Sequence, residues 1–504
     1  MEKNGVTEPA DLRLPPLLHR LRPLLAAEAR PVYVVGGTVR DALLRRPIHD
    51  IDLVVAAEAI PLAFRLADAL DLPAYVLDAE RDVGRVIVPG DDLTLDVARF
   101  RGPTLEDDLR GRDFTINALA LPATESSDVV IDRHGGLDDL RAGVIRAIHE
   151  RSIADDPVRA LRAARFAAQF GFALTGDTES AARSAAIDLP ERASPERIRD
   201  ELTKVLLTGA PQRGVALLHE LGLVAVVLPA VAALDGVAQS PPHHEDVWRH
   251  TLSVLRYLVQ VESIVGQERA DSAAPDDWAA DVTMLVAPYR YGLQGHLARQ
   301  LDGGLRGQAL LRWAGLLHDA GKAATQTVDA DGRIRFLGHD NVGADMSRGL
   351  LARLAFSNEA VRHARDIVAG HMRPLNLALE RRTPSRRTTY RYFRALHEAG
   401  LDVGLLALAD HLATYDGRGQ GEDWPALLDV IRTLFAAYFD DHERTIAPPR
   451  LLDGVAIMAL LDEPPGHEIG RLLRLLEEAQ AAGEVNSRDE AIALVRRHHN
   501  HLSP

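Results

Sequence analysis

The sequence predicts an α+β protein whose first part is a mixed sheet with helices and whose remainder is helical. Short β-branched runs alternate with helical patterns as far as about residue 146. From about residue 150 onward the strand-like runs disappear, and amphipathic ladders such as DPVRALRAARFAAQF replace them. The chain has 504 residues, 46% hydrophobic and 26% charged, so it can form about three domains with buried cores.

The first unit is predicted from β-branched runs on either side of a glycine turn. Residues 31–55 indicate a strand, the turn, a helix and a second strand. A further helix is expected over residues 60–70, and strands near 74–77, 85–88 and 93–100 complete the sheet.

The helical remainder is interrupted by a proline-containing break, SPPHHED at residues 240–246. The stretch over 262–305 has weak periodicity and is interpreted as an insertion or a mobile excursion. The last helices are expected near 454–462, 467–482 and 488–499. We expect five regions: a helical extension at 1–29, a head at 30–146, a helical neck at 147–239, a second helical unit at 240–440 and a helical tail at 441–504.

The composition excludes several kinds of site. The chain has no cysteine, so disulfides, zinc-thiolate sites and thiol nucleophiles are ruled out, and any metal must be held by His, Asp or Glu. No apolar run approaches the roughly 20 residues that cross a bilayer, so we expect a cytoplasmic protein without a membrane partner. The net charge is −15, so a nucleic-acid partner requires a local concentration of basic residues.

A pair of acidic residues is the first candidate site. Asp50 and Asp52 lie two apart in a strand-like run, so both side chains leave one face while Ile51 and Leu53 point into the core. Asp96, in a second strand-like run, is a candidate third carboxylate. Carboxylates grouped in this way suit Mg²⁺, which prefers oxygen ligands and keeps positions open for phosphates.

A glycine turn precedes the acidic pair. Gly36 and Gly37 leave room for phosphates, the following helix offers free N–H groups, and Arg40 lies in its first turn. Taken alone, a D-x-D pair is more typical of a solvated strand end, and a GG turn is weaker evidence still. Their joint order in GGTVRDALLRRPIHDIDLVV favours a functional site.

This segment resembles the class II tRNA nucleotidyltransferases and bacterial poly(A) polymerases of the DNA polymerase β superfamily. The resemblance spans about residues 30–225 and includes four further blocks in order: DLRGRDFTINALAL, IDRHGGLDDLRAGVIR, DDPVRALRAARFAAQFGF and PERIRDELTKVL. It implies a polymerase β-like head, an all-α neck, Mg²⁺ at the acidic pair, CTP and ATP as substrates, and the 3′ end and acceptor stem of tRNA as the partner.

The resemblance also implies roles for individual residues. Nucleotide or ribose contacts are implied for Arg112, Asp113 and Asn117. Asp156 and Arg159 match the pair that reads the Watson–Crick edge of the incoming base, for which a carboxylate and a guanidinium are suitable partners. An alternative is that Asp156 only caps the helix that begins at Pro157.

Three residues are implied to support the base-reading pair. Asp155 occupies the position where the family usually has Glu, so its orienting role is open. Arg197 and Glu201 are implied to brace the pair from behind, although their i, i+4 spacing also fits an ordinary surface ion pair.

The choice of nucleotide is open. Only GPTLED, residues 102–107, stands where CCA-adding relatives usually carry a longer loop, and this shortening resembles the CC-adding branch. We expect template-independent transfer of CMP, AMP or both to the 3′ end of tRNA. A poly(A) polymerase ranks second because the C-terminus has no long basic run. A phosphohydrolase with a nucleotide-sensing first domain and a non-enzymatic tRNA-binding RNA chaperone are further alternatives.

A second constellation lies after residue 240. The adjacent pair at 318–319 in GLLHDAGK resembles the HD phosphohydrolase superfamily, and an ordered set of His and Asp residues surrounds it. An HD dipeptide alone is more often structural, whereas the full set predicts a site for a second divalent metal, Mn²⁺, Ni²⁺ or Mg²⁺. The alternatives are an active phosphohydrolase and a vestigial pocket. The predicted ligands are His250, His318, Asp319, His339, His371 and Asp410.

Two basic clusters are candidates for RNA contacts. Arg159, Arg162 and Arg165 crowd one predicted helix. The segment RRTPSRRTTYRYFR at 381–394 combines six arginines with aromatic residues, which suits phosphate contacts and base stacking, although a solvated helix face is an equal alternative. The candidates in that segment are Arg386, Arg387 and Arg391. The sequence does not distinguish a monomer from a homodimer.

Overall fold

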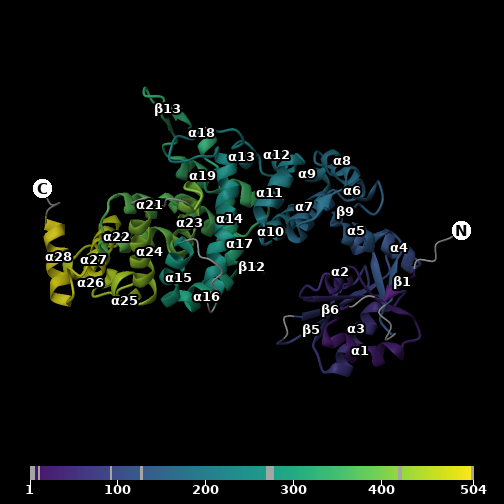
Figure 1. Cartoon of the computed structure of the whole chain (residues 1–504). Helices are drawn as coiled ribbons and strands as arrows, with labels where there is room; N and C mark the ends of the chain where they lie inside the picture. The colour runs from purple at the N-terminus through teal and green to yellow at the C-terminus, as the bar shows by residue number, and fades with distance from the viewer. Residues whose placement is uncertain are drawn as a thin grey trace. The chain divides into compact units, whose positions relative to one another are not determined.

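The computed structural model describes residues 6–9, 12–90, 93–124, 129–267, 277–302, 304–417 and 423–500. The chain divides into two compact units. The first comprises Met1–Arg197 and Glu220–Val226, and the second comprises Ile198–His219 and Val227–Pro504. Figure 1 shows the large sheet in the purple and blue N-terminal part, and helices throughout the green and yellow part.

The first unit is built on a mixed sheet, as predicted. Strands β3 and β6 are parallel, and the other neighbours in the sheet are antiparallel. In spatial order the eight strands are β1 (Val6–Pro9), β8 (Val129–Asp132), β7 (Leu119–Pro122), β2 (Val32–Val35), β3 (Asp50–Val55), β6 (Leu93–Arg99), β5 (Val83–Val88) and β4 (Ala74–Asp78).

Helices cover this sheet because its strands alternate apolar and polar positions. Ile51 and Leu53 of β3 are fully buried, and they share a core with Leu62 and Leu66 of α3. The helices around the sheet are α1 (Pro16–Ala26), α2 (Gly37–Leu43), α3 (Ala59–Leu70), α4 (Leu105–Arg110), η1 (Thr115–Asn117) and α5 (Gly136–Ala142).

The N-terminal segment combines a strand and a helix. Sequence patterns predicted a helical extension over residues 1–29, and α1 accounts for its second half. Strand β1 forms instead at residues 6–9 because its backbone pairs with β8, with Val6 opposite Ile131. Because β8 is far from β1 in the sequence, no local sequence pattern predicts β1.

Helices continue the first unit beyond the sheet. Short parallel strands β9 (Val144–Ile145) and β10 (Ala173–Leu174) accompany them. The helices are α6 (Ser152–Asp155), α7 (Val158–Phe170), α8 (Gly176–Ala185), α9 (Leu189–Arg192) and α12 (Leu223–Val227), while the residues of α10 (Pro195–Leu206) and α11 (Pro211–Glu220) are divided between the two units.

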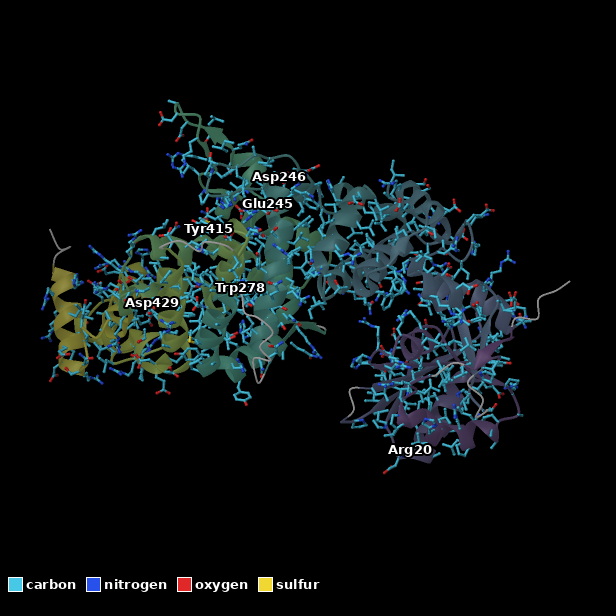
Figure 2. All side chains as sticks on the ribbon, in the orientation of Figure 1. Arg20, Glu245, Asp246, Trp278, Tyr415 and Asp429 are labelled. Atoms are coloured by element: carbon cyan, nitrogen blue, oxygen red, sulfur yellow. The ribbon has the colours of Figure 1, made fainter. Side chains whose placement is uncertain are left out.

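The second unit is helical and centres on α23 (Ala399–Thr414), which is buried at every position. Asp246, labelled in Figure 2, starts α14 (Val247–Gly266) by accepting a hydrogen bond from the Arg249 N–H at 2.8 Å. The other helices of this core are α13 (Pro229–Ala232), α17 (Gly307–Leu317), α18 (Lys322–Thr325), α19 (His339–Arg353), α20 (Asn358–Gly370), α21 (Met372–Leu379), α22 (Arg386–Leu396), α24 (Asp423–Phe439) and α25 (His442–Thr445).

The stretch interpreted as an insertion contains regular structure. After α14 it forms α15 (Asp277–Val286), η2 (Ala287–Tyr289), α16 (Arg290–Ala298) and the hairpin of β11 (Gln300–Asp302) and β12 (Leu305–Arg306). Residues 268–276 of this stretch lie outside the described residues. A second hairpin, β13 (Thr327–Val328) with β14 (Ile334–Arg335), adds to the few strands outside the sheet, where only helices were predicted.

The predicted tail helices are present at the expected positions. They are α26 (Gly454–Leu461), α27 (His467–Ala481) and α28 (Arg488–Asn500), and they share a small apolar core. Within the described part of the chain, no helix combines the length and apolar character that crossing a membrane requires.

Candidate functional site

A cavity of about 1390 Å³ in the first unit brings together residues that are far apart in the sequence. Most of its polar lining consists of carboxylates and guanidinium groups. The predicted site residues that line it are Gly37, Arg40, Asp50, Asp52, Asp96, Arg112, Asp113, Asn117, Asp156, Arg159, Arg162, Arg165 and Arg197.

The sheet register places the acidic pair at this cavity. Asp50 and Asp52 lie on β3 with buried Ile51 between them, so both side chains emerge on one face, as predicted. The hydroxyl of Thr38, on α2, accepts a hydrogen bond from the Asp52 N–H at 2.9 Å and donates one to the Asp50 carbonyl at 3.1 Å. Thr94 donates to the Asp50 carboxylate at 2.6 Å. The backbone of the pair is therefore held by α2, and the Asp50 carboxylate is held by β6.

The electrostatics of Asp52 fit a cation ligand. Desolvation by the surrounding sheet, together with repulsion from Asp96 and Asp50, raises the pKa of Asp52 to about 6, although Arg112 and Arg40 oppose the rise. A divalent cation at this position offsets the repulsion among the three carboxylates. The residues present therefore suit Mg²⁺ chemically.

Asp96 lies beside Asp52, but it is already engaged. The two residues are partners in the parallel register of β3 and β6. Both oxygens of Asp96 accept hydrogen bonds from Arg85 on β5, each at 2.6 Å. In this arrangement Asp96 contributes negative charge next to Asp52, while its lone pairs are directed to a guanidinium.

The glycine turn gives the chain room next to the cavity. Gly36 has a φ of +65°, and a side-chain carbon there would lie 2.3 Å from Nη1 of Arg112. Gly37 opens α2 and lines the cavity. The positive φ therefore favours glycine at position 36, whereas a side-chain carbon at Gly37 would meet only ordinary van der Waals neighbours.

Arg40 is buried under the turn rather than extended into open solvent. Its guanidinium donates to the Asn117 side chain and to Asp41, and it lies 4.8 Å from the ring centre of Phe170. The part of Arg40 that lines the cavity is thus held by three neighbours.

Asp113 organises the next group of predicted residues. It accepts hydrogen bonds from Asn117 at 2.8 Å and from Arg162 at 2.7 Å. Burial acts to raise the pKa of Asp113, but Arg162 and Asn117 outweigh it and lower this pKa to about 2. Arg112 is held separately, by Asp108 at 2.9 Å. Arg165 stacks its guanidinium 4.4 Å from the ring centre of Phe166.

Asp156 and Arg159 sit at the start of α7. Arg159 donates to the carbonyls of Arg112 and Gly111 at 2.8 and 2.9 Å, which orients its guanidinium at the cavity wall. Its Nε lies 3.9 Å from the Asp156 carboxylate. Asp156 also accepts from the Val158 N–H at 3.3 Å, the type of contact on which the capping interpretation depends.

The three supporting residues are placed differently. Arg197 donates to Asp156 at 2.7 Å. Asp155 is exposed and pairs with Arg151 at 3.2 Å. Glu201 belongs to the second unit, where it pairs with Lys204 at 3.2 Å.

The short segment that replaces a longer loop is ordered. Thr104 and Asp107 form a capping box at the start of α4, with the Asp107 N–H donating to the Thr104 hydroxyl at 3.2 Å. Asp108 accepts from the Arg101 N–H at 3.1 Å. Residues 102–107 are thus a turn and a helix start.

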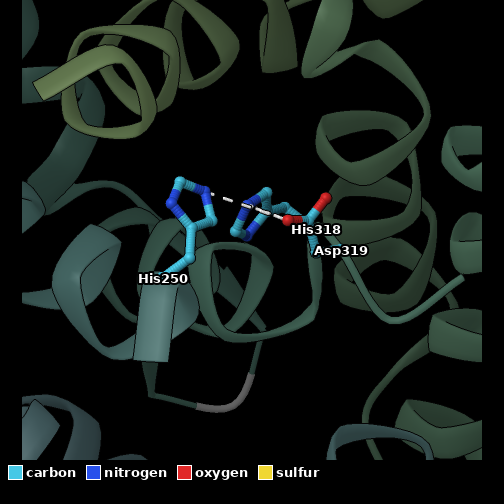
Figure 3. Close-up of side chains that lie close together, drawn as sticks. All are labelled: His250, His318 and Asp319. Carbon is cyan, nitrogen blue, oxygen red and sulfur yellow. Dashed lines mark ion pairs between the residues drawn. The ribbon is translucent and has the colours of Figure 1, made fainter. Parts of the chain in front are cut away.

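The second unit contains a buried cluster of the six residues predicted to bind metal. Figure 3 shows His250, from α14, facing His318 and Asp319. Asp319 lies 3.9 Å from His250, 3.2 Å from His318 and 3.5 Å from His339. His371 is 3.2 Å from His339, and Asp410 is 3.0 Å from His250.

The protonation pattern of this HD cluster suits a metal. The Nδ1 atoms of His318, His339 and His371 lie 2.7–2.8 Å from backbone carbonyls, so Nδ1–H donation to these carbonyls turns the Nε2 atoms toward the interior of the cluster. Burial opposes ionisation of Asp319, yet His318 and Lys322 hold its pKa well below the ordinary range. Among the described residues, His318 Nε2 has no hydrogen-bond partner. A deprotonated carboxylate with free imidazole nitrogens is the ligand set that a divalent ion needs.

The predicted RNA-binding arginines on α22 face the tail. Arg387 pairs with Glu484 at 2.6 Å, and Arg391 with Glu478 at 2.6 Å. Arg386 donates to the carbonyl of Arg444 at 2.7 Å. These contacts neutralise part of the positive charge on which the RNA prediction rests.

Several residues around the sites were not identified from the sequence. Arg85 donates to Asp96, and Thr94 donates to Asp50. These contacts depend on the register between strands, which the sequence alone does not show. His243 packs 4.9 Å from the His250 ring, and burial lowers its pKa to about 3. The HHED run offered a signal for His243 that the ordered His and Asp set did not include.

Three family models match the chain. Residues 32–146 match the poly A polymerase head domain, 171–234 match a probable RNA and SrmB-binding site of polymerase A, and 294–415 match the HD domain. The head match contains Asp50 and Asp52. The HD match contains every residue of the HD cluster except His250.

Two relatives match nearly the whole chain. The A-adding tRNA nucleotidyltransferase of Deinococcus radiodurans is 35% identical over 493 residues, which are 95% of this chain and 98% of that protein. The CC-adding tRNA nucleotidyltransferase of Thermus thermophilus is 32% identical over 476 residues, 92% of this chain and 93% of that protein.

Solved structures of CCA-adding enzymes share the fold. An apo form covers 96% of this chain and 95% of its own, with a TM-score of 0.58 and 21% identity. The Thermotoga maritima CCA-adding enzyme in complex with tRNA covers 97% of both chains, with a TM-score of 0.52 and 20% identity. Similar folds also include CCA-adding enzyme complexes with ATP and with CTP.

Proposed function

Because this chain belongs to the tRNA nucleotidyltransferase family, we propose that it transfers nucleotides from CTP or ATP to the 3′ end of tRNA in the cavity of its first unit. The observation that carries the proposal is the meeting of the Asp50–Asp52 pair with an arginine-lined wall that includes Asp156 and Arg159. The full-length match to relatives with this activity supports it. We assign the reaction to the head at 30–146 and the neck at 147–239.

Each part of the cavity has a role in this reaction. A magnesium ion held by Asp50 and Asp52 supplies activation of the terminal ribose hydroxyl when it is bound. Gly36 and Gly37 leave space for the triphosphate, and Arg40 and Arg112 balance its charge.

The base is selected by the Asp156–Arg159 pair. A carboxylate accepts from the exocyclic amino group of cytosine or adenine, and a guanidinium donates to a ring nitrogen or carbonyl acceptor. Arg197 holds the Asp156 carboxylate at 2.7 Å, and backbone carbonyls hold Arg159. A pair fixed in this way presents the same pattern to both bases and leaves the keto group of guanine or uracil without a donor.

Among the partial reactions we favour addition of the two C residues. The short, helix-capped segment over residues 102–107 supports this choice, because it leaves little chain to rearrange between C and A addition. The similarity to an A-adding relative favours the alternative, addition of the terminal A alone.

An extension assay tests these proposals. Transcripts of one tRNA are prepared that end before the first C, after one C and after two Cs, and each is incubated with Mg²⁺ and either CTP or ATP. Extension by C alone supports CC addition, and extension only of the third transcript by ATP supports A addition. A long A tail would identify a poly(A) polymerase, and no Mg²⁺-dependent extension contradicts nucleotide transfer altogether.

We also propose that the HD cluster binds a divalent ion, Mn²⁺, Ni²⁺ or Mg²⁺, and supports hydrolysis of phosphate esters. The convergence of three Nε2 atoms on the ionised Asp319, at 3.2–3.9 Å, supports this assignment. The bound ion supplies activation of water, and Lys322, 2.8 Å from Asp319, keeps that carboxylate ionised. Release of phosphate from 2′,3′-cyclic and terminal phosphate RNA ends, measured with each metal in turn, tests it.

A further inference from the structure

A second His–Asp cluster lies in the same unit, apart from the HD cluster. It consists of His296 on α16, His363 on α20 and Asp402 on α23. Asp402 and Asp410 lie eight residues apart on α23, which separates the two clusters by about 12 Å along the helix. The two clusters share no residue.

The three side chains converge on one point. His296 Nε2 lies 2.8 Å and His363 Nε2 lies 2.9 Å from the same oxygen of Asp402, Oδ2. The two imidazole rings are 6.2 Å apart at an angle of 44°, so they approach the carboxylate from different directions. In a tetrahedral zinc site, with bonds of about 2.0–2.1 Å, ligand atoms lie roughly 3.3 Å apart. The two nitrogen–oxygen contacts are about half an ångström shorter than this ligand separation, and all three ligand atoms lie within 4.8 Å of one another.

The carboxylate retains unused binding capacity. Asp402 is fully buried, and within the described residues its second oxygen, Oδ1, has no hydrogen-bond partner. A buried carboxylate oxygen without a partner is costly, so a simple structural triad would be expected to use both oxygens. Here Oδ2 of Asp402 contacts both histidines, whereas Oδ1 has no partner among the described residues.

One of the three side chains of this cluster borders an open space. His296 lines a cavity of about 400 Å³ whose wall also includes Arg299, Glu398 and Leu401. Arg299 and Glu398 are ion-paired with each other, so the cavity presents no uncompensated cation at its wall there. Two imidazoles and one carboxylate, with water as a fourth ligand, match the donor set of divalent transition metals.

We propose that His296, His363 and Asp402 form a further metal site, the second in this unit, which takes a divalent transition-metal ion of the Zn²⁺ class. The site joins α16, part of the stretch interpreted as an insertion, to two helices of the HD core. Its role is to fix α16 in place, and it is independent of nucleotide transfer in the first unit.

Metal retention by the full-length protein tests the proposal. In one background the HD cluster is silenced by His318→Ala with Asp319→Ala. The protein is loaded with Zn²⁺, passed through a desalting column and analysed by elemental mass spectrometry. We expect this background to retain about one Zn²⁺ per chain, and the further change His363→Gln to remove it. A matched control, His371→Gln, removes a ligand of the HD cluster and should leave the retained ion unchanged.

Hydrogen exchange gives a second measurement that does not depend on the ligand variants. In the silenced background, Zn²⁺ should slow amide exchange in α16 relative to the chelator-treated protein. Retention of no Zn²⁺, retention unchanged by His363→Gln in a protein with an unaltered circular dichroism spectrum, or unchanged exchange in α16 would each overturn the proposal.

Discussion

Arg85 holds both carboxylate oxygens of Asp96, with two hydrogen bonds of 2.6 Å across the antiparallel pair of β5 and β6. A carboxylate in such a two-point ion pair is expected to be a weak metal ligand. We therefore predict that Asp96→Asn lowers the rate of nucleotide addition far less than Asp50→Asn or Asp52→Asn does. A single-turnover assay at saturating Mg²⁺ measures the difference, and equal losses for all three variants would make Asp96 a full ligand.

Replacement of Asp52 should abolish chemistry without unfolding the protein. Loss of one metal ligand removes several kcal/mol of transition-state stabilisation, so Asp52→Asn should slow incorporation by about 100- to 1000-fold. Asp68→Asn, an exposed acidic position on α3, is the control. Incorporation by the Asp52 variant within tenfold of wild type would exclude Asp52 as a ligand.

The raised pKa of Asp52 predicts a pH dependence. The pKa of this carboxyl is about 6 in the folded protein without metal, whereas its ordinary value, taken for the unfolded chain, is 3.8. Ionising Asp52 therefore costs more free energy in the folded state than in the unfolded state, and it lowers the free energy of unfolding. Its favourable contribution is complete below pH 3.8 and is lost as the pH rises through 6. Asp52→Asn should thus raise the free energy of unfolding at pH 7, without Mg²⁺, by up to about 3 kcal/mol. Denaturant titration at pH 7 and at pH 4.5 measures this gain, which should shrink at the lower pH.

Magnesium affinity should follow the same ionisation. Only the ionised carboxylate binds the cation, so the Mg²⁺ requirement for incorporation should fall as the pH rises through about 6. The concentration of Mg²⁺ at half-maximal rate, measured from pH 5 to pH 8, tests this. A requirement independent of pH contradicts the proposed role of Asp52.

Base selection should depend on Asp156 and not on its neighbour. Asp156→Ala removes one half of the reading pair, so kcat/KM for CTP should fall by about 10- to 100-fold relative to UTP. Asp155→Ala is the matched control, because Asp155 is exposed and its carboxylate forms an ion pair with Arg151. If Asp156 acts solely as a helix cap, both nucleotides should be affected equally and the melting temperature should fall.

The α22 arginines can be tested through their acidic partners. Glu484→Gln removes the shorter of the two ion pairs of Arg387, at 2.6 Å, and leaves the pair with Glu478 at 3.2 Å. The change adds no charge to α22 itself. If this surface binds RNA, affinity should rise and the dependence of binding on salt should steepen. Filter binding of tRNA at several salt concentrations measures both, with Glu477→Gln as the control, because Glu477 lies on α27 and pairs with Arg450 rather than with an arginine of α22. Unchanged affinity would restrict these arginines to holding the tail.

Local patterns in the sequence predicted the elements whose residues lie close together in the chain. Alternation in DIDLVV predicted that Asp50 and Asp52 share a face, and the structure has them so. The pairing of β1 with β8 and of Arg85 with Asp96 depends on register between separate strands, and no short-range pattern encodes it. His296, His363 and Asp402 come from three helices with no shared motif, so only the packing of those helices brings them together.

The hydroxyl of Thr38, which bridges two peptide groups of β3, sets the phase of that strand. Slippage by a single residue would turn both acidic groups inward against Leu62 and Leu66 and bring Ile51 to the cavity. The two hydrogen bonds of the Thr38 hydroxyl therefore favour the correct register of β3 in the sheet. Thr38→Val keeps the shape of the side chain and removes both hydrogen bonds of the hydroxyl. We expect this variant to lose nucleotide transfer while the protein stays folded.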